Sequence, residues 1–289
     1  MNSNHTEKPL VQSIERALLL LEALAQHQEG CSIKQLSEAT SLNKSTVHRI
    51  LQTLLAFGYV RQSQNNDNYY LGFQILTLSN RLLSEFDIVA LAKPYLRKLC
   101  QDTGLVIQLS IRNFDMAVFL DKAENPNQNI RMYSQIGKTI PLYCSSSGKA
   151  LLAWENDDEI GRTIRGTTYT PFTQFTITDH KSFLSEIISI RQKGYATDFF
   201  EHEESICCAA SPIVNSSGKT IAAICFAGTF LQISAANIPE YIVKINETAS
   251  LLSRKIGCTN YPARLSMEDV NADAKRYDSC IQTILQKFK

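Results

Sequence analysis

The chain has 289 residues, enough for about two domains, and its 44% hydrophobic and 20% charged residues are typical of a folded protein rather than a disordered one. It has no apolar run long enough to span a bilayer, and its polar start, residues 1–9, lacks the apolar segment of a signal peptide, so we expect a cytoplasmic protein. A formal net charge of +1 excludes a uniformly basic nucleic-acid binder, so any DNA-binding surface must be local.

The start of the chain carries the signals of two helices joined by a polar loop. The first helix is predicted over residues 13–25, where apolar side chains recur at helical spacing. They are Ile14, Ala17, Leu18, Leu21 and Leu24. Ser32 and Gln35 have the Ser-x-x-Gln spacing of a capping box, so a second, short helix is predicted from Ile33 to about Ala39.

A third helix and a hairpin follow. Asn43 is a good N-cap residue, the apolar positions of the next stretch line one helical face, and Gly58 ends that helix. Residues 59–61 and 69–71, on either side of a polar turn, have the pattern of a hairpin. Three helices and a hairpin predict a winged helix-turn-helix domain over residues 10–72.

Residues 73–86 continue as an apolar helix pattern and are expected to form a linker helix. Beyond them, the pattern predicts a helix over residues 87–104, bent at Pro94, and then strands and helices in mixed order. The strands are expected at 106–111, 117–120, 130–134, 206–214 and 220–227, and the helices at 147–154, 179–193 and 239–256. This order predicts an α+β domain with an antiparallel sheet over residues 87–258, followed by a polar tail, residues 259–289, that could end in a helix but contains no motif.

The third helix has the side chains of a DNA-reading helix on the face opposite its apolar stripe. In a helix-turn-helix, the second helix of the pair enters the major groove with its N-terminal residues against the bases. Arg49 and Gln52 suit base contacts, and the first-turn residues suit phosphate contacts. The predicted DNA-binding residues are Lys34, Lys44, Ser45, Thr46, His48, Arg49, Gln52 and Arg61.

The alternative is that this face is merely the solvated side of an amphipathic helix. Two observations favour DNA binding. The stretch between Glu38 and Asp67 contains Lys44, Arg49 and Arg61 but no acidic residue. The order of two short helices across a tight turn, a Gly-terminated helix and a hairpin is also specific to the motif.

Several segments, in the same order, resemble the IclR family of bacterial transcriptional regulators, and the resemblance covers about residues 10–262. The segments are SIERALLLL (13–21), LNKSTVHRILQ (42–52) and YYLG (69–72), then IGKTIPLY (136–143), GKALLA (148–153), GY (194–195) and CAASP (208–212). The resemblance implies a GAF-like effector-binding domain and a dimer or tetramer. Because one short recognition helix reads few base pairs, we expect a palindromic operator bound by a dimer. Residues 129–137 further resemble the branch that represses sugar-acid catabolism, such as the regulators of 2-keto-3-deoxygluconate use.

An effector site is expected where a helix begins, at Ser145 to Ser147, because backbone N–H groups at a helix start attract a carboxylate. Simple capping is the alternative. By the resemblance, the effector-binding residues are Ser146, Ser147, Asp198, Cys208, Cys225 and Ala227, and Arg131 and Ser145 are further candidates. Asp198 would accept hydrogen bonds from ligand hydroxyls, unless it is a surface acid.

The chain departs from the family pattern in that same wall. Cys225 and Ala227 stand where serines are common, Phe200 replaces an acid and Ser205 replaces a glycine. These replacements leave fewer hydrogen-bond donors for the effector.

An enzyme and a scaffold that only oligomerises are the alternatives. Ser147-Gly148-Lys149 resembles the end of a P-loop but lacks its first glycine and its Ser or Thr. The acidic run 201–204 favours a solvated loop over a metal site, and no Ser-His-acid set is indicated for His180 or His202. The eight cysteines show no paired spacing, so we expect neither disulfides, nor a metal, nor a cofactor.

Overall fold

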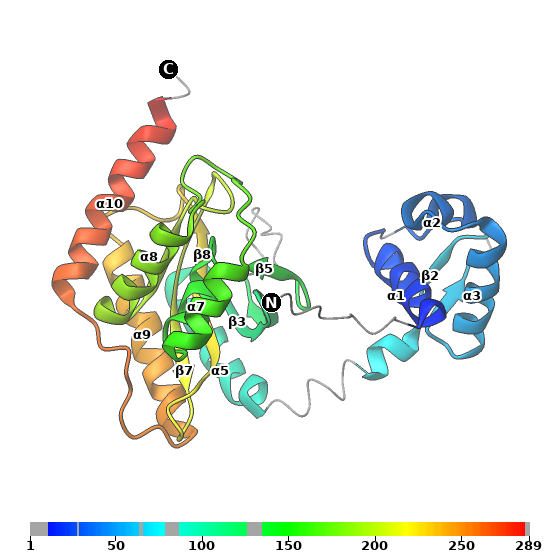
Figure 1. Ribbon diagram of the computed structural model, residues 1–289. Coiled ribbons are helices and arrows are strands. Elements are labelled where there is room, and N and C mark those ends of the chain that lie inside the picture. The colour runs from blue at the N-terminus through cyan, green and yellow to red at the C-terminus, as the bar shows by residue number, and fades with distance from the viewer. Residues whose placement is uncertain (1–10, 28, 64–65, 79–86, 126–134, 287–289) are drawn as a thin grey trace, which may run out of the picture. The chain divides into compact units, whose positions relative to one another are not determined.

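The computed structural model describes residues 11–27, 29–63, 66–78, 87–125 and 135–286. The chain divides into two compact units, Met1–Phe86 and Asp87–Lys289 (Figure 1). The predicted strand over residues 130–134 and the second half of the predicted linker helix lie outside the described residues.

The first unit is the predicted winged helix-turn-helix. It consists of α1 (Gln12–Ala25), α2 (Ile33–Thr40), α3 (Lys44–Ala56) and the antiparallel pair β1 (Val60–Gln62) and β2 (Tyr69–Leu71). The capping box is confirmed, since the Ser32 hydroxyl accepts from the Gln35 amide and Gln35 Oε1 accepts from the Ser32 amide at 2.9 Å. Asn43 occupies the N-cap position of α3, but its side chain makes no capping hydrogen bond.

The core of the first unit is formed by one side of each helix and by the hairpin. Its buried side chains are Leu20, Leu24, Cys31, Leu36, Val47, Leu51, Val60 and Tyr69. Helix α1 has more apolar surface than this core covers, because Ile14 and Leu18 are 58% and 53% exposed. Residues 73–78, which follow the hairpin, are helical.

The second unit is built on a six-stranded antiparallel sheet in the order β5-β4-β3-β8-β7-β6. The strands are β3 (Val106–Asn113), β4 (Met116–Ala123), β5 (Thr139–Pro141), β6 (Ala196–Phe199), β7 (Ile206–Val214) and β8 (Thr220–Thr229). The predicted antiparallel α+β domain is therefore confirmed, but the short strands β5 and β6 do not stand out in the sequence.

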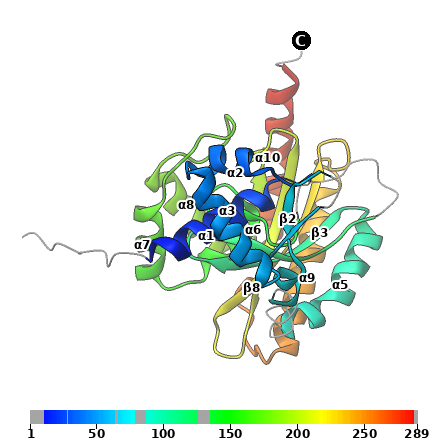
Figure 2. The same cartoon turned by 90° about the vertical axis from the view of Figure 1, so that its right-hand side faces the viewer.

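Helices cover both faces of this sheet (Figure 2). One face packs against α5 (Asp87–Thr103) and α9 (Ile238–Lys255), as the ring contact between Phe226 of β8 and Tyr241 of α9 shows. The other face packs against α6 (Ser146–Ala153), with α7 (Asp157–Gly166) and α8 (His180–Lys193) beyond it. Cys225, Ala210 and Ala196 belong to the core beneath α6.

The strand register brings distant residues into rows on the α6 face. Asp198 of β6 lies opposite Cys208 of β7, which lies opposite Ala227 of β8. In the next row on the same face, Cys225 of β8 lies between Ala210 and Gln108 of β3. Because side chains alternate along a strand, both rows project toward α6.

The polar tail ends in the helix α10 (Met267–Gln286), which packs on the second unit. Tyr277 lies against Phe199 and Phe200, at ring-centroid distances of 5.4 and 5.7 Å, and its hydroxyl donates to the Ile233 carbonyl. Phe200, the residue that replaces an acid of the family pattern, is thus part of the contact with α10.

Candidate DNA-binding surface and effector pocket

Helix α3 presents its polar face to solvent. Val47 and Leu51 are buried in the core of the first unit, whereas the predicted base-reading residues Arg49 and Gln52 are exposed. Lys44, Ser45 and His48 are exposed as well, and Thr46 is half-buried. The side chains that the sequence predicts for DNA contact are therefore available on one helical face.

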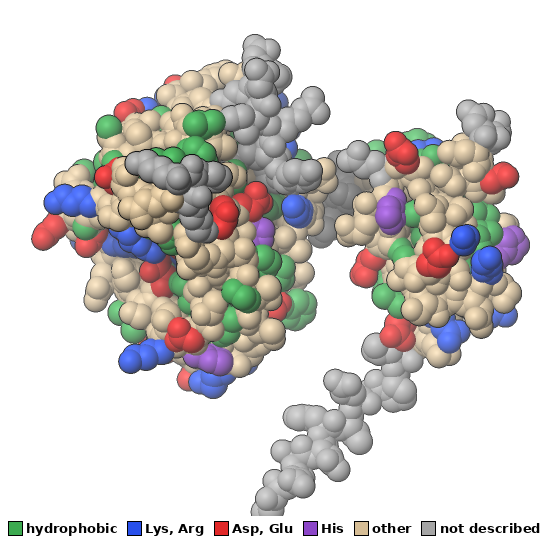
Figure 3. Space-filling view, turned by 90° about the horizontal axis from the view of Figure 1, so that it is seen from above, with side chains coloured by type: hydrophobic (Ala, Val, Ile, Leu, Met, Phe, Trp, Pro, Cys, Tyr) green, Lys and Arg blue, Asp and Glu red, His purple; other side chains and the backbone are tan. Residues whose placement is uncertain are grey.

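Two further predicted DNA contacts lie outside α3. Lys34 of α2 is exposed and pairs with Glu38 at 3.9 Å, an exposed pair that adds little stability. The Arg61 guanidinium lies 4.6 Å from the ring centroid of Tyr70, its cross-strand neighbour in the wing. On the face drawn in Figure 3, positive and negative side chains are interspersed, as expected for a chain of nearly zero net charge.

A groove of about 740 Å³ runs between α1 and α3. Ile14 and Leu18 line it on the α1 side, and Thr46 and Arg49 lie on the α3 side. The DNA-reading helix therefore borders an accessible apolar surface within the first unit.

The three serines begin α6 as predicted. The Ser145 hydroxyl accepts from the Gly148 amide at 3.1 Å and donates to the Pro141 carbonyl at 2.8 Å, so this hydroxyl caps the helix. Ser146 and Ser147 are each 2% exposed, and their backbone N–H groups make no hydrogen bond to the residues that the structure describes. Free amides at a helix start form an anion site.

Gly148 allows the close approach on which this turn depends. A Cβ at this position would lie 2.4 Å from the Leu142 Cα, so no larger residue fits without moving the backbone. The glycine therefore has a packing role, and the sequence Ser147-Gly148-Lys149 does not form a nucleotide-binding loop.

The structure brings together five of the predicted effector residues. Asp198, Cys208 and Ala227 share one row of the α6 face, and Cys225 follows in the next row. The Ser147 side chain lowers the pKa of the Cys225 thiol, which places the start of α6 close to the sheet at this point. Cys208 is half-buried, whereas Asp198 and Ala227 are each 3% exposed. Arg131 lies outside the described residues.

Asp198 is not a surface acid. Its Oδ1 accepts from the Glu201 amide at 2.8 Å, which closes the turn after β6. Burial, together with the negative charge of Glu201, raises the pKa of Asp198 to about 8. The sequence predicts a charged acceptor at this position, whereas the structure favours a carboxyl group that holds its proton at neutral pH.

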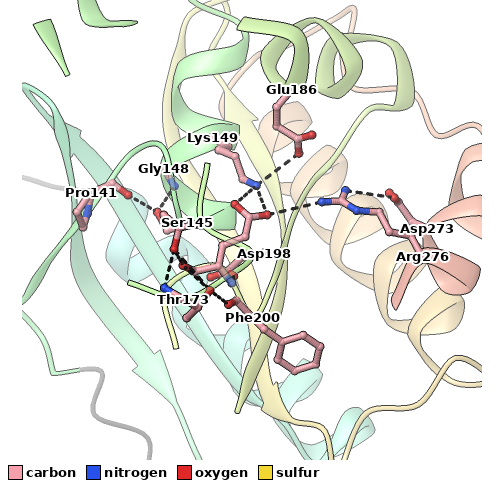
Figure 4. Close-up of polar contacts among 12 residues, drawn as sticks. Pro141, Ser145, Gly148, Lys149, Thr173, Glu186, Asp198, Phe200, Asp273 and Arg276 are labelled. Atoms are coloured by element: carbon pink, nitrogen blue, oxygen red, sulfur yellow. Dashed lines mark hydrogen bonds and ion pairs between the residues drawn. The ribbon is translucent and has the colours of Figure 1, made fainter. Parts of the chain in front are cut away.

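A buried ion network lies behind Asp198 (Figure 4). The Lys149 ammonium, 0% exposed, contacts both carboxylate oxygens of Glu201 at 2.7 and 2.8 Å and reaches Glu186 at 3.4 Å. Burial lowers the pKa of Lys149, but the carboxylates of Glu201 and Glu186 outweigh this and raise it overall. The lysine is therefore charged.

Helix α10 extends this network. Arg276 lies 3.9 Å from Glu201 and 3.8 Å from Asp273, and Asp273 accepts from Lys193 at 3.0 Å and from the Tyr195 hydroxyl at 2.7 Å. The cations Lys149, Lys193 and Arg276 match the acids Glu186, Glu201 and Asp273 in number. The charge of Lys149 also lowers the pKa of Asp198, but burial and the negative charge of Glu201 outweigh it.

The prediction of a solvated acidic loop at residues 201–204 is therefore wrong for Glu201, which is 1% exposed, although Glu203 and Glu204 are exposed. The loop is held by two threonines. Thr173 donates to the Phe200 carbonyl and Thr176 to the Glu201 carbonyl, each at 2.6 Å. These bonds support the left-handed conformation of Phe200, whose φ is 67°.

The described part of the chain contains neither a cluster of metal-binding side chains nor a membrane-spanning helix. Among those residues, no group of three His, Cys, Asp or Glu side chains is placed to hold a metal ion. No described helix is both long and apolar enough to cross a membrane.

Comparisons with known proteins agree with this geometry. Residues 80–254 match the model of the bacterial transcriptional regulator IclR C-terminal domain, and residues 13–64 match the IclR helix-turn-helix domain. The chain is 33% identical to the HTH-type transcriptional regulator KdgR of Escherichia coli K12 over 87% of this chain and 95% of the relative. It is 32% identical to the DNA-binding transcriptional repressor YiaJ of the same strain, over 86% and 89% of the two chains.

A solved structure shows the same arrangement of elements. The Thermotoga maritima IclR crystal structure is 26% identical to the chain, covers 86% of this chain and 100% of the solved one, and superposes with a TM-score of 0.71.

Proposed function

The chain belongs to the IclR family of bacterial transcriptional regulators, and from that membership we propose that this DNA-binding regulator represses an operon for carbohydrate or sugar-acid catabolism under the control of a small carboxylate. The observation that carries the proposal is the buried start of α6, whose Ser146 and Ser147 amides make no hydrogen bond to the described residues, on the sheet face that also carries Asp198, Cys208 and Ala227. The YiaJ relative, a DNA-binding transcriptional repressor, supports the assignment to a repressor, and the KdgR relative supports the assignment to a transcriptional regulator.

On DNA, Arg49 and Gln52 contact base edges, and Lys44, Ser45 and Thr46 contact the phosphates at the start of α3. The exposure of these side chains on one face supports this assignment. His48 faces the same groove. Lys34 and Arg61 contact the backbone from α2 and from the wing.

The protein binds a palindromic operator as a dimer, because one short recognition helix reads too few base pairs for useful selectivity. The exposed apolar side chains of the first unit support a contact between two copies. Leu76 is 66% exposed and, like Ile14 and Leu18, needs a partner surface. Leu82 and Leu83 of the predicted linker helix lie outside the described residues.

The effector is a sugar acid or a 2-keto acid. Its carboxylate accepts from the amides of Ser146 and Ser147, which the helix dipole favours. Its hydroxyl groups face Asp198, and the protonated carboxyl of Asp198 donates to one of them. Cys208, Cys225 and Ala227 form the apolar floor between these two ends.

Calorimetry on the full chain tests the effector. We expect 2-keto-3-deoxygluconate or pyruvate to bind, and the Gly148→Ala variant, which pushes the start of α6 away from Leu142, to lose that binding. Binding of aromatic or uncharged compounds but of no sugar acid or 2-keto acid would contradict the assignment and leave the serine turn with a capping role alone.

A further inference from the structure

Strand β3 adds polar groups to the effector face that the family pattern does not name. Gln108 is 5% exposed and lies opposite Cys225 on the face that packs against α6. Ser110, two residues along the same face, is fully buried, and its hydroxyl has no hydrogen-bond partner. Buried polar groups normally have partners, so this strand presents hydrogen-bonding capacity that the chain itself does not use.

The orientation of the Gln108 amide follows from its neighbour. Burial raises the pKa of the Cys225 thiol to about 12, so the thiol is protonated and can donate. It donates to Gln108 Oε1 at 3.2 Å, and the Ser147 side chain on its other side lowers the pKa of the thiol. The carbonyl end of the amide is thereby used.

The NH₂ group at the other end of the Gln108 amide is available for a hydrogen bond. Its nitrogen has no hydrogen bond to the described residues and does not belong to the fully buried side-chain atoms that lack a partner, so it keeps some access to the space beside the side chain. An amide nitrogen carries two donors that an acceptor in this space could use. The group therefore lies ready for an acceptor that the protein does not supply.

The neighbouring side chains of Ser147, Cys225 and Gln108 indicate where that acceptor would bind. Ser147 provides a backbone amide for the proposed carboxylate. Only the Cys225 thiol lies between Ser147 and Gln108, so Gln108 is close to the carboxylate position. A donor at this place reaches the atoms next to the carboxylate rather than the far end of the ligand, which faces Asp198.

We propose that the Gln108 amide donates to the oxygen on C2 of the effector and makes the pocket selective for 2-keto acids over acids without that oxygen. This inference rests on the proposed function and deepens it. It also gives a reason why the wall tolerates Cys225 and Ala227, because β3 supplies the donor that these two side chains lack.

The test compares two acids that differ only in the C2 oxygen, pyruvate and propionate, by calorimetry on the full chain. We expect the wild type to bind pyruvate roughly tenfold more tightly than propionate, the effect of about one good hydrogen bond. Gln108→Met keeps the length of the side chain but has no donor, so it should bring that ratio close to one. Propionate affinity should change by less than about threefold. Gln108→Leu provides a second variant should the first fold poorly.

Thr197→Val is the matched control. Thr197 also carries a buried hydroxyl without a partner, but it lies opposite Ala209 on the face toward α9. We expect it to leave the affinities of both acids unchanged.

Three results would overturn the inference. An equal loss of both acids in Gln108→Met would mean that the amide supports the pocket or the carboxylate but does not read C2. A wild type without preference for pyruvate would exclude the role directly. If the wild type bound neither acid nor 2-keto-3-deoxygluconate, the proposed effector class would fail, and this inference would fail with it.

Discussion

Replacement of Lys149 by Met should destabilise the second unit strongly, because it leaves the Glu201 carboxylate buried without its main counter-ion. Lys149 supplies both contacts shorter than 3 Å to this carboxylate. The remaining cation, Arg276, lies 3.9 Å away, and its side chain is 45% exposed. Breaking one partner out of a buried pair costs about 3–5 kcal/mol of unfolding free energy.

The double variant Lys149→Met with Glu201→Leu separates charge from packing. It removes both charges and should be clearly more stable than the single variant, because replacing a whole buried pair with apolar residues is often close to neutral. Lys181→Met, an exposed lysine of α8, is the control and should change stability by less than about 0.5 kcal/mol.

Urea unfolding followed by tryptophan fluorescence measures the unfolding free energy of the second structural unit. Trp154 is the only tryptophan, and it caps the C-terminus of α6, so its signal reports the second unit. A single variant within 1 kcal/mol of the wild type would refute the reasoning. So would a double variant as unstable as the single one, because the loss would then come from packing.

The cost should also depend on pH. Burial already raises the pKa of Glu201 above its unfolded value of about 4.3, and removal of the Lys149 charge, which lowers it, should raise it further. Stability is then lost as pH rises above that value. The single variant should be closer to the wild type at pH 5 than at pH 8.

Three further predictions concern DNA binding, the effector site and the capping box of α2. Arg49→Ala should weaken operator binding by about 1–3 kcal/mol with little effect on random DNA. Lys44→Ala should weaken binding to operator and random DNA alike and reduce the slope of log K against log salt concentration by about one. Competition binding at several salt concentrations measures both effects. Effector affinity should fall as pH rises from 7 to 9, because Asp198, with its pKa of about 8, then loses its proton and gains a charge. In calorimetry, Asp198→Asn should abolish this pH dependence. A pH dependence that persists in the variant would mean that Asp198 is not its source. Ser32→Ala should lower the stability of the first unit by about 1 kcal/mol through loss of the capping box, measured by circular dichroism, and an unchanged unfolding curve would contradict that role.

The first unit could be predicted because its signals are local. A capping box, a glycine helix end and an apolar stripe each lie within a few residues of the element that they define. The exposed side of α1 could not be predicted in this way, because Ile14 and Leu18 have the same helical spacing as buried residues and differ only in what packs against them.

The effector face was only partly predictable. Strand register decides which residues share a face, and the positions of Asp198 and Cys225 came from the family resemblance rather than from the pattern. The protonated state of Asp198 depends on Glu201, and the burial of Glu201 depends on Lys149 and on Arg276 of α10. No local signal in the sequence marks a charge network whose members come from three separate helices and a loop.

The most direct test of the account is the effect of a 2-keto acid on DNA binding by the full chain. Fluorescence anisotropy on a DNA sequence selected from a random pool, titrated with 2-keto-3-deoxygluconate at fixed salt, measures both proposed activities together. We predict a sequence-specific complex whose affinity falls at least tenfold with this acid but is unaffected by a neutral sugar. A complex without sequence preference, or one that no carboxylate alters, would contradict the account.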